Sequence, residues 1–206
     1  MRDRHYLQAA RCPPSLTPRS FGLWTIEKRL RPADEPAGGM FRLLVGGDQQ
    51  TALCRVTEAT MHLPGGEIVM EDSLIELRRH LPIWLVAHGR VLVTGLGLGC
   101  VVRGLLASRD VEHVDVIEID RGILEHVGEE FRGNDRVVLH HGNALNCKMP
   151  GTRWDFAWHD IWCEGSGLQL LHTRLIARYR KRCARQGAWM LPRIVKRKLA
   201  HWELVG

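Results

Sequence analysis

The stretch from Val91 to Gly99 constrains the fold of this chain more than any other feature. It reads Val-Leu-Val-Thr-Gly-Leu-Gly-Leu-Gly, so a short apolar run ends in alternating glycines, and a second apolar run follows from Val101 to Leu106. This order predicts a buried strand, a tight turn and a helix. Such a turn suits a nucleotide, because glycine lets the backbone approach a ligand closely and a helix start offers unpaired N–H groups.

The spacing of these glycines separates several classes of nucleotide site. A dinucleotide fingerprint reads G-x-G-x-x-G and would place its third glycine at Cys100, whereas this chain reads G-x-G-x-G. The missing third glycine argues against a site for a nicotinamide or flavin dinucleotide. A phosphate-binding P-loop is excluded, because no Gly-Lys-Ser/Thr follows the loop. A glycine-bearing turn without any ligand stays the alternative.

The segment Val91–Gly99 resembles the first motif of the Rossmann-like S-adenosylmethionine-dependent methyltransferases, and more narrowly that of the spermidine-synthase-like branch. Thr94 is a departure, because many methyltransferases carry an acidic residue just before the first glycine. The resemblance implies an α/β fold with a mostly parallel Rossmann-like sheet and flanking helices. Few residues follow Leu191, so we expect a shortened methyltransferase fold with fewer than the usual seven strands.

The segment Val114–Asp120 is expected to form the second buried strand. Glu118 follows Gly99 by 19 positions, close to the spacing of an acidic residue that holds a ribose. A carboxylate can accept hydrogen bonds from both ribose hydroxyls. The segment also resembles the second motif of the same families, which implies that Glu118 is the ribose ligand. We interpret Asp120 as the N-cap of a helix over Arg121–Phe131.

Two further strands are predicted at Arg136–His140 and Trp154–Trp162. The first precedes Asn143, at a position where these families often carry an aspartate that meets the adenine amino group; a plain Asn turn is the alternative. The second brings His159 and Asp160 to the carboxyl edge of the sheet, where ligands bind in such folds. By resemblance, Asp160 matches an aspartate that helps deprotonate the attacking amine in aminopropyltransferases. We predict Asp160 and His159 as catalytic residues, with capping and packing as the alternative.

The leading hypothesis is an S-adenosylmethionine-dependent methyltransferase of unknown acceptor, whose cofactor product is S-adenosylhomocysteine. The resemblance implies a cofactor site at Thr94, Gly95, Leu96, Gly97, Gly99, Glu118, Ile119, Asn143 and Ala144. The alternative is an aminopropyltransferase that uses decarboxylated S-adenosylmethionine, because Glu71–His80 followed by Pro82 resembles the segment before the glycine loop of spermidine synthase. Against it, Leu74-Ile75 replaces the Tyr-His pair expected ahead of Glu76. No metal site is predicted, since His140 and His141 lack a ligand cluster.

The placement of proline and glycine predicts a loosely ordered arm, a small β-rich N-terminal region and a Rossmann-like domain, over residues 1–20, 21–70 and 71–206. Expected strands of the second part are Met40–Val45, Thr51–Val56 and Glu67–Met70. In the third part, a leading helix opens at Asp72-Ser73 and is kinked at Pro82.

A helix predicted over Leu168–Cys183 precedes a fifth strand at Gly187–Leu191, and its basic residues are expected on a stripe formed by Arg174, Arg178, Lys181 and Arg185. With the net charge of +6, the stripe supports a third hypothesis, a non-catalytic nucleotide-binding module that docks nucleic acid. A solvated face is the alternative. A small-molecule acceptor is the leading partner, and a homodimer is left open. No apolar run reaches the roughly 18 residues of a membrane span and no CxxC pair occurs, so we expect a cytoplasmic protein with reduced thiols.

Overall fold

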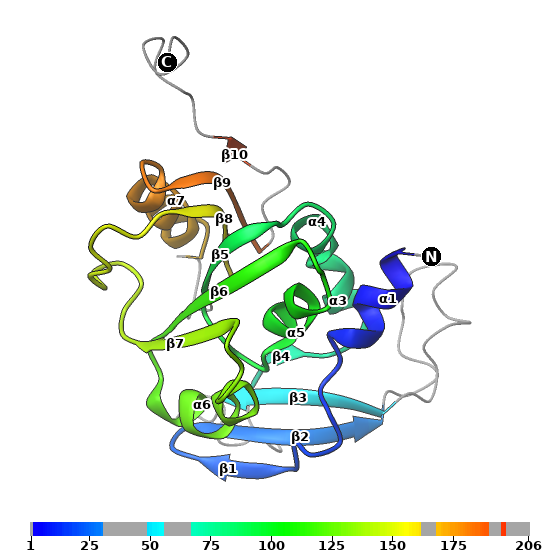
Figure 1. The fold of residues 1–206 in the computed structure, drawn as a ribbon. Coiled ribbons are helices and arrows are strands. Elements are labelled where there is room, and N and C mark those ends of the chain that lie inside the picture. The colour runs from blue at the N-terminus through cyan, green and yellow to red at the C-terminus, as the bar shows by residue number, and fades with distance from the viewer. Residues whose placement is uncertain (1, 31–48, 56–66, 162–167, 190–194, 197–206) are drawn as a thin grey trace, which may run out of the picture.

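A small antiparallel sheet is built from the N-terminal part of the chain (Figure 1). The computed structural model describes residues 2–30, 49–55, 67–161, 168–189 and 195–196. The strands of this sheet are β1 (Arg19–Phe21), β2 (Trp24–Leu30), β3 (Gln49–Arg55) and β4 (Glu67–Glu71), in that spatial order. The predicted strands at residues 51–56 and 67–70 are confirmed, whereas 40–45 lies outside the described residues. Sequence reasoning missed β2, because its charged centre lacks a clear alternation.

The larger sheet has the strand order β10-β9-β8-β5-β6-β7. Its strands are β5 (Gly89–Thr94), β6 (Val111–Glu118), β7 (Val137–His141), β8 (Trp154–His159), β9 (Cys183–Ala188) and β10 (Val195–Lys196). All neighbours are parallel except β9 and β10. The parallel part thus has the doubly wound order 3-2-1-4-5, whose direction of winding reverses between β5 and β8. This confirms the predicted Rossmann-like fold, and the described sheet is shorter than seven strands.

Helices cover both faces of the larger sheet. On one face, α5 (Cys100–Leu106), α6 (Arg121–His126) and the 3-10 turn η2 (Gly128–Phe131) share a core with the apolar side of β5 and β6. On the other face, α7 (Leu168–Tyr179) packs against β8 and β9 (Figure 1). No helix among the described residues is long and apolar enough to cross a membrane.

The leading helix of the larger domain is divided at His80, two residues before the proline at which the sequence predicts a kink. The first piece, α3 (Leu74–Arg79), starts at Ser73, whose hydroxyl accepts a 3.2 Å hydrogen bond from the Glu76 N–H. Pro82 stands in the first turn of the second piece, α4 (Leu81–Trp84), where its missing N–H costs no helical hydrogen bond. His80 lies between the two pieces and is 1% exposed.

The N-terminal segment differs from the loosely ordered arm expected over residues 1–20. It contains α1 (Arg2–Ala9), which packs beside α5, and Ala10 is fully buried. Cys12 is held in place as well, because its N–H donates to the Asp72 carboxylate at 3.0 Å. Prolines restrict only the residues just before them. The prolines of this segment follow α1, so they left that helix free to form.

The basic stripe expected on one helix is not present, because the helix is shorter than predicted. Helix α7 ends at Tyr179, and Cys183 already belongs to β9 together with Arg185. The chain turns at Arg182, whose N–H donates to the Tyr179 carbonyl and whose guanidinium donates to the Thr152 carbonyl. Helical spacing had included Cys183, but pairing with β8 draws this segment into the sheet.

Candidate active site

A pocket of about 440 Å³ lies outside the carboxyl ends of β5, β6 and β8. Its size is within the roughly 300–1,000 Å³ typical of small-molecule sites. One wall comes from the larger sheet, through Gly95, Gly97, Glu118 and Asp160. The opposite wall comes from the N-terminal sheet, which contributes Leu23, Trp24, Leu53, Arg55, Val69 and Met70. The pocket therefore lies at the winding reversal between β5 and β8, where doubly wound folds bind their ligands.

The glycine loop after β5 forms the floor of this pocket. Gly95 has φ 91°, and a Cβ there would lie 2.0 Å from the Asp160 carbonyl oxygen. Gly97 has φ 51°, and a Cβ there would lie 2.6 Å from the Met70 sulfur, which accepts a 3.2 Å hydrogen bond from the N–H of the next residue, Leu98. Both positions thus need glycine for conformation. Gly99 caps α5 and faces Phe131, away from the pocket.

Glu118 is the best-placed carboxylate of the pocket. Its Oε2 accepts from the Leu96 N–H at 2.7 Å and its Oε1 accepts from the Asp120 N–H at 2.8 Å. These bonds fix the carboxylate beside the glycine loop and leave each oxygen a second lone pair. Burial raises the pKa of Glu118, while the backbone N–H groups oppose that rise. The arrangement suits an acceptor for two adjacent hydroxyl groups.

Asp120 has the capping role that the sequence predicts. Its Oδ1 accepts from the Ile123 N–H at 3.0 Å at the start of α6. Its Oδ2 accepts from the Trp24 indole N–H at 2.8 Å, which ties β2 of the N-terminal sheet to the pocket. One side chain therefore both caps a helix and holds the two pocket walls together.

The sequence predicts that Glu118 holds the ribose of a cofactor, so replacing it with alanine should weaken binding of that cofactor about tenfold to a hundredfold, because a charge-assisted hydrogen bond contributes roughly 1.5–3 kcal/mol. Titration calorimetry with S-adenosylhomocysteine measures the effect. Glu112→Ala serves as the matched control, since Glu112 is exposed at the far end of the same strand. Equal dissociation constants for Glu118→Ala and the wild type would remove Glu118 from the ribose site.

Asp160, Glu76 and Trp189 lie together in the lining of the pocket. The Asp160 side chain is 7% exposed, and its pKa is raised well above the usual value by burial and by the nearby Glu76, Cys100 and Glu118. Burial also raises the pKa of Glu76. Glu76 is held by hydrogen bonds from the Trp189 indole and from Arg79. Two poorly solvated carboxyl groups thus face one end of the pocket.

His159 does not reach this pocket. Its ring is fully buried, with Nδ1 3.0 Å from the Thr94 hydroxyl and Nε2 3.1 Å from Gln186 Oε1, and it stacks on Tyr179. Burial lowers its pKa to about 4. Neighbouring strand residues point to opposite faces of a sheet, so Asp160 faces the pocket and His159 faces α7. The catalytic prediction for His159 is not supported by this geometry, and Thr94 serves as its partner in the core.

The remaining predicted cofactor residues fall into two groups. Ile119 lines the pocket and is 62% exposed, and Leu96 contributes its N–H to Glu118. Asn143 and Ala144 do not line the pocket. The Asn143 side chain accepts from the Leu145 N–H at 2.9 Å, and the Ala144 carbonyl accepts from the Tyr179 hydroxyl. Asn143 thus forms the local turn that was the alternative interpretation.

Several pocket residues were not found from the sequence. Trp24, Met70 and Arg55 come from strands of the N-terminal sheet, whose packing on the domain has no local sequence signal. Glu76 could have been predicted, because it lies in the segment Glu71–His80, which resembles the segment before the glycine loop of spermidine synthase. Within the described residues, no group of three or more His, Cys, Asp or Glu side chains is placed to hold a metal ion.

Comparisons with known proteins give only distant structural similarity. No family model matches the sequence, and no curated protein is significantly similar. The 23S rRNA methyltransferase ErmE is 17% identical with a TM-score of 0.42, over 54% of this chain and 43% of that one. A dimethyladenosine transferase from Plasmodium falciparum is 18% identical with a TM-score of 0.42, over 54% and 39%. The CcbJ methyltransferase from Streptomyces caelestis is 20% identical with a TM-score of 0.40, over 51% and 44%. This chain therefore spans less than half the length of each of these structures.

Proposed function

We propose that this chain is an S-adenosylmethionine-dependent methyltransferase. The observation that carries the proposal is the meeting of the glycine loop, Glu118 and Asp160 at one pocket beside the winding reversal of the sheet. Gly95 and Gly97 allow close approach to the ligand, and Glu118 offers a fixed carboxylate for the ribose hydroxyls. Trp24, Met70 and Ile123 add apolar surface for a base or a thioether chain.

The charge of the pocket fits a cationic cofactor. Four carboxyl groups line it, those of Glu76, Glu118, Asp120 and Asp160. A sulfonium ion is stabilised by such surroundings, because opposite charges attract strongly in a poorly solvated site. When bound, S-adenosylmethionine supplies an electrophilic methyl group on that sulfonium. Among the described lining residues Arg55 is the only cation, which makes it the candidate to meet the carboxylate of the methionine part.

The same charge distribution favours an amine acceptor over a polyanion. A protonated amine is attracted by Glu76 and Asp160, whereas a phosphate backbone would be repelled there. An ammonium group has no free electron pair, so it must lose a proton before it can act as a nucleophile. Both Asp160 and Glu76 line the pocket, so in this proposal Asp160 accepts that proton and Glu76 holds the amine in position.

Aminopropyl transfer is the second candidate, and the acidic lining of the pocket is what favours it. Decarboxylated S-adenosylmethionine lacks the carboxylate and carries one more net positive charge, which the four carboxyl groups would attract. Arg55 argues against this candidate. It lines the pocket as a cation, and S-adenosylmethionine has a carboxylate for it to bind, whereas the decarboxylated form has none. The relative affinity for S-adenosylmethionine and for its decarboxylated form therefore distinguishes methyl transfer from aminopropyl transfer.

Titration calorimetry of the full chain tests the proposal. We expect micromolar binding of S-adenosylhomocysteine and S-adenosylmethionine, and weaker binding of decarboxylated S-adenosylmethionine, methylthioadenosine and NAD. Preference for the decarboxylated form would favour aminopropyl transfer instead. Binding of none of these ligands by the folded protein would exclude both transferases.

Gly97→Val should abolish this binding, because a branched residue is strained at φ 51° and would place its side chain against the ligand and Met70. Gly133→Val is the matched control, since Gly133 also has a positive φ of 79° but nothing lies within 4 Å of a Cβ there. Circular dichroism confirms that each variant folds. A folded Gly97→Val protein with normal affinity would show that the cofactor does not pass this loop.

A further inference from the structure

A buried histidine lies directly behind the pocket carboxylate Asp160. His80 stands between α3 and α4, is 1% exposed, and has its ring between Trp84 and Trp158. Its Nε2 lies 3.8 Å from Asp160 Oδ2. Among the described residues, neither ring nitrogen of His80 has a hydrogen-bond partner. A buried donor without a partner is rare in proteins, so this pair points to a contact that forms in the working enzyme.

We propose that His80 is the positioning residue for Asp160: its neutral ring donates the Nε2–H to Asp160 Oδ2 and so keeps this carboxyl group ionised and ready to accept a proton. The inference rests on the proposed function, in which Asp160 takes a proton from an amine acceptor. A closure of less than 1 Å brings the two atoms to a normal hydrogen-bond distance of about 2.7–3.2 Å.

The surroundings of both groups support a neutral imidazole beside a carboxylate that needs a donor. Burial, with a further contribution from Arg79, lowers the pKa of His80 to about 3, so its ring carries one proton at neutral pH. The charged and titratable described groups that face Asp160 are Glu76, Cys100 and Glu118, and all three raise its pKa in addition to burial. Without a donor, this carboxyl group would hold its own proton and could not take another.

In this proposal His80 does not carry the transferred proton; it stabilises the ionised form of Asp160, which does. The proton of the acceptor ammonium moves to Asp160, the acceptor nitrogen gains its free electron pair, and the resulting carboxylic acid later releases the proton to solvent. His80 keeps its proton on Nε2 throughout, because its role is to stabilise the ionised state of Asp160. A hydrogen bond to the charged form of an acid lowers its pKa.

The experiment is an NMR titration of the Asp160 carboxyl carbon in the full chain, assigned by the loss of its signal in Asp160→Asn. His80→Phe keeps an aromatic ring and removes the donor, and His80→Gln keeps an N–H near the position of Nε2. We expect the pKa of Asp160 to rise by about one unit or more in His80→Phe and to stay close to the wild-type value in His80→Gln. An unchanged or lower pKa in folded His80→Phe overturns the proposal.

A second measurement uses only the wild-type protein, so it tests the proposed Nε2–H donor even if His80→Phe does not fold. Nitrogen NMR of the wild type reports which ring nitrogen of His80 carries the proton. We expect Nε2, and a proton on Nδ1 alone contradicts the proposal. Neither measurement requires cofactor or acceptor. Failure of this inference is therefore distinguishable from failure of the proposed methyl transfer, which the calorimetric titration tests.

Discussion

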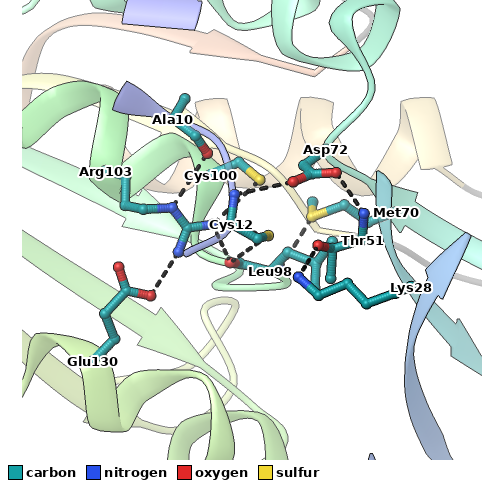
Figure 2. Close-up of polar contacts among 10 residues, drawn as sticks. All are labelled: Ala10, Cys12, Lys28, Thr51, Met70, Asp72, Leu98, Cys100, Arg103 and Glu130. Carbon is teal, nitrogen blue, oxygen red and sulfur yellow. Dashed lines mark hydrogen bonds and ion pairs between the residues drawn. The ribbon is translucent and has the colours of Figure 1, made fainter. Parts of the chain in front are cut away.

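Replacing Arg103 with methionine is expected to destabilise the protein by about 3 kcal/mol or more, because two buried backbone carbonyls lose their charged donor at roughly 1–3 kcal/mol each. The Arg103 side chain is only 8% exposed and lies in α5 directly after the glycine loop. Its guanidinium donates to the Ala10 carbonyl at 3.2 Å and to the Leu98 carbonyl at 2.7 Å, and it pairs with Glu130 at 2.7 Å (Figure 2).

The same guanidinium lies 3.1 Å from the sulfur of Cys12 and 3.6 Å from that of Cys100. One side chain thus joins the N-terminal segment, the glycine loop and η2, as Figure 2 shows. Loss of Arg103 should therefore also release the segment around Ala10, which hydrogen exchange can detect. Urea denaturation measures the free energy of unfolding. Arg121→Met is the control, because its ion pair with Glu125 is largely exposed and should contribute less than about 1 kcal/mol. Equal effects of the two substitutions would show that this network contributes little.

The positions of the glycine loop, Glu118 and Asp120 could be predicted from local sequence, because each feature lies within one strand-turn-helix unit or at the end of the next strand. The glycines of Val91–Gly99 require an unusual backbone, and Glu118 ends the next strand at a fixed spacing. Asp120 follows as a helix cap, which is a local signal too. The parallel arrangement of β5 and β6 then brings Glu118 to the glycine loop without further information from the rest of the chain.

The rest of the pocket depends on packing between distant segments, and for those residues the sequence was a weaker guide. Met70 and Trp24 reach the pocket only because the N-terminal sheet packs on the larger domain. The assignment of His159 failed for a simpler reason. Alternation along a strand already separates it from Asp160, so both could not face one pocket. Of the two residues, only Asp160 lines the pocket.

Replacing Asp160 with asparagine should lower turnover by at least about tenfold, because general base catalysis typically contributes roughly 10²–10⁴-fold. Asparagine keeps the shape of the side chain but cannot accept the proton of an ammonium acceptor. Affinity for S-adenosylhomocysteine should change only a few-fold, since Glu118 and the glycine loop are untouched. Asp155→Asn is the matched control, because Asp155 is exposed near the start of β8, the strand that Asp160 directly follows. Unchanged turnover in Asp160→Asn would make Asp160 structural and leave methyl transfer to positioning alone.

The pH dependence of stability gives this substitution a second readout that needs no acceptor. Burial and the neighbouring carboxyl groups raise the pKa of Asp160 in the folded protein above its unfolded value. The folded state therefore favours the protonated acid, and the stabilisation from Asp160 is fully present only below the unfolded pKa of about 3.9. It is lost as the pH rises from that value through the folded pKa. Asparagine stays neutral, so Asp160→Asn should gain stability relative to the wild type across this window, while its turnover falls. If Asp160 served packing alone, its substitution would lower the free energy of unfolding. A gain in stability together with a loss of turnover instead indicates that the carboxylate is kept for its chemistry, at a cost to folding.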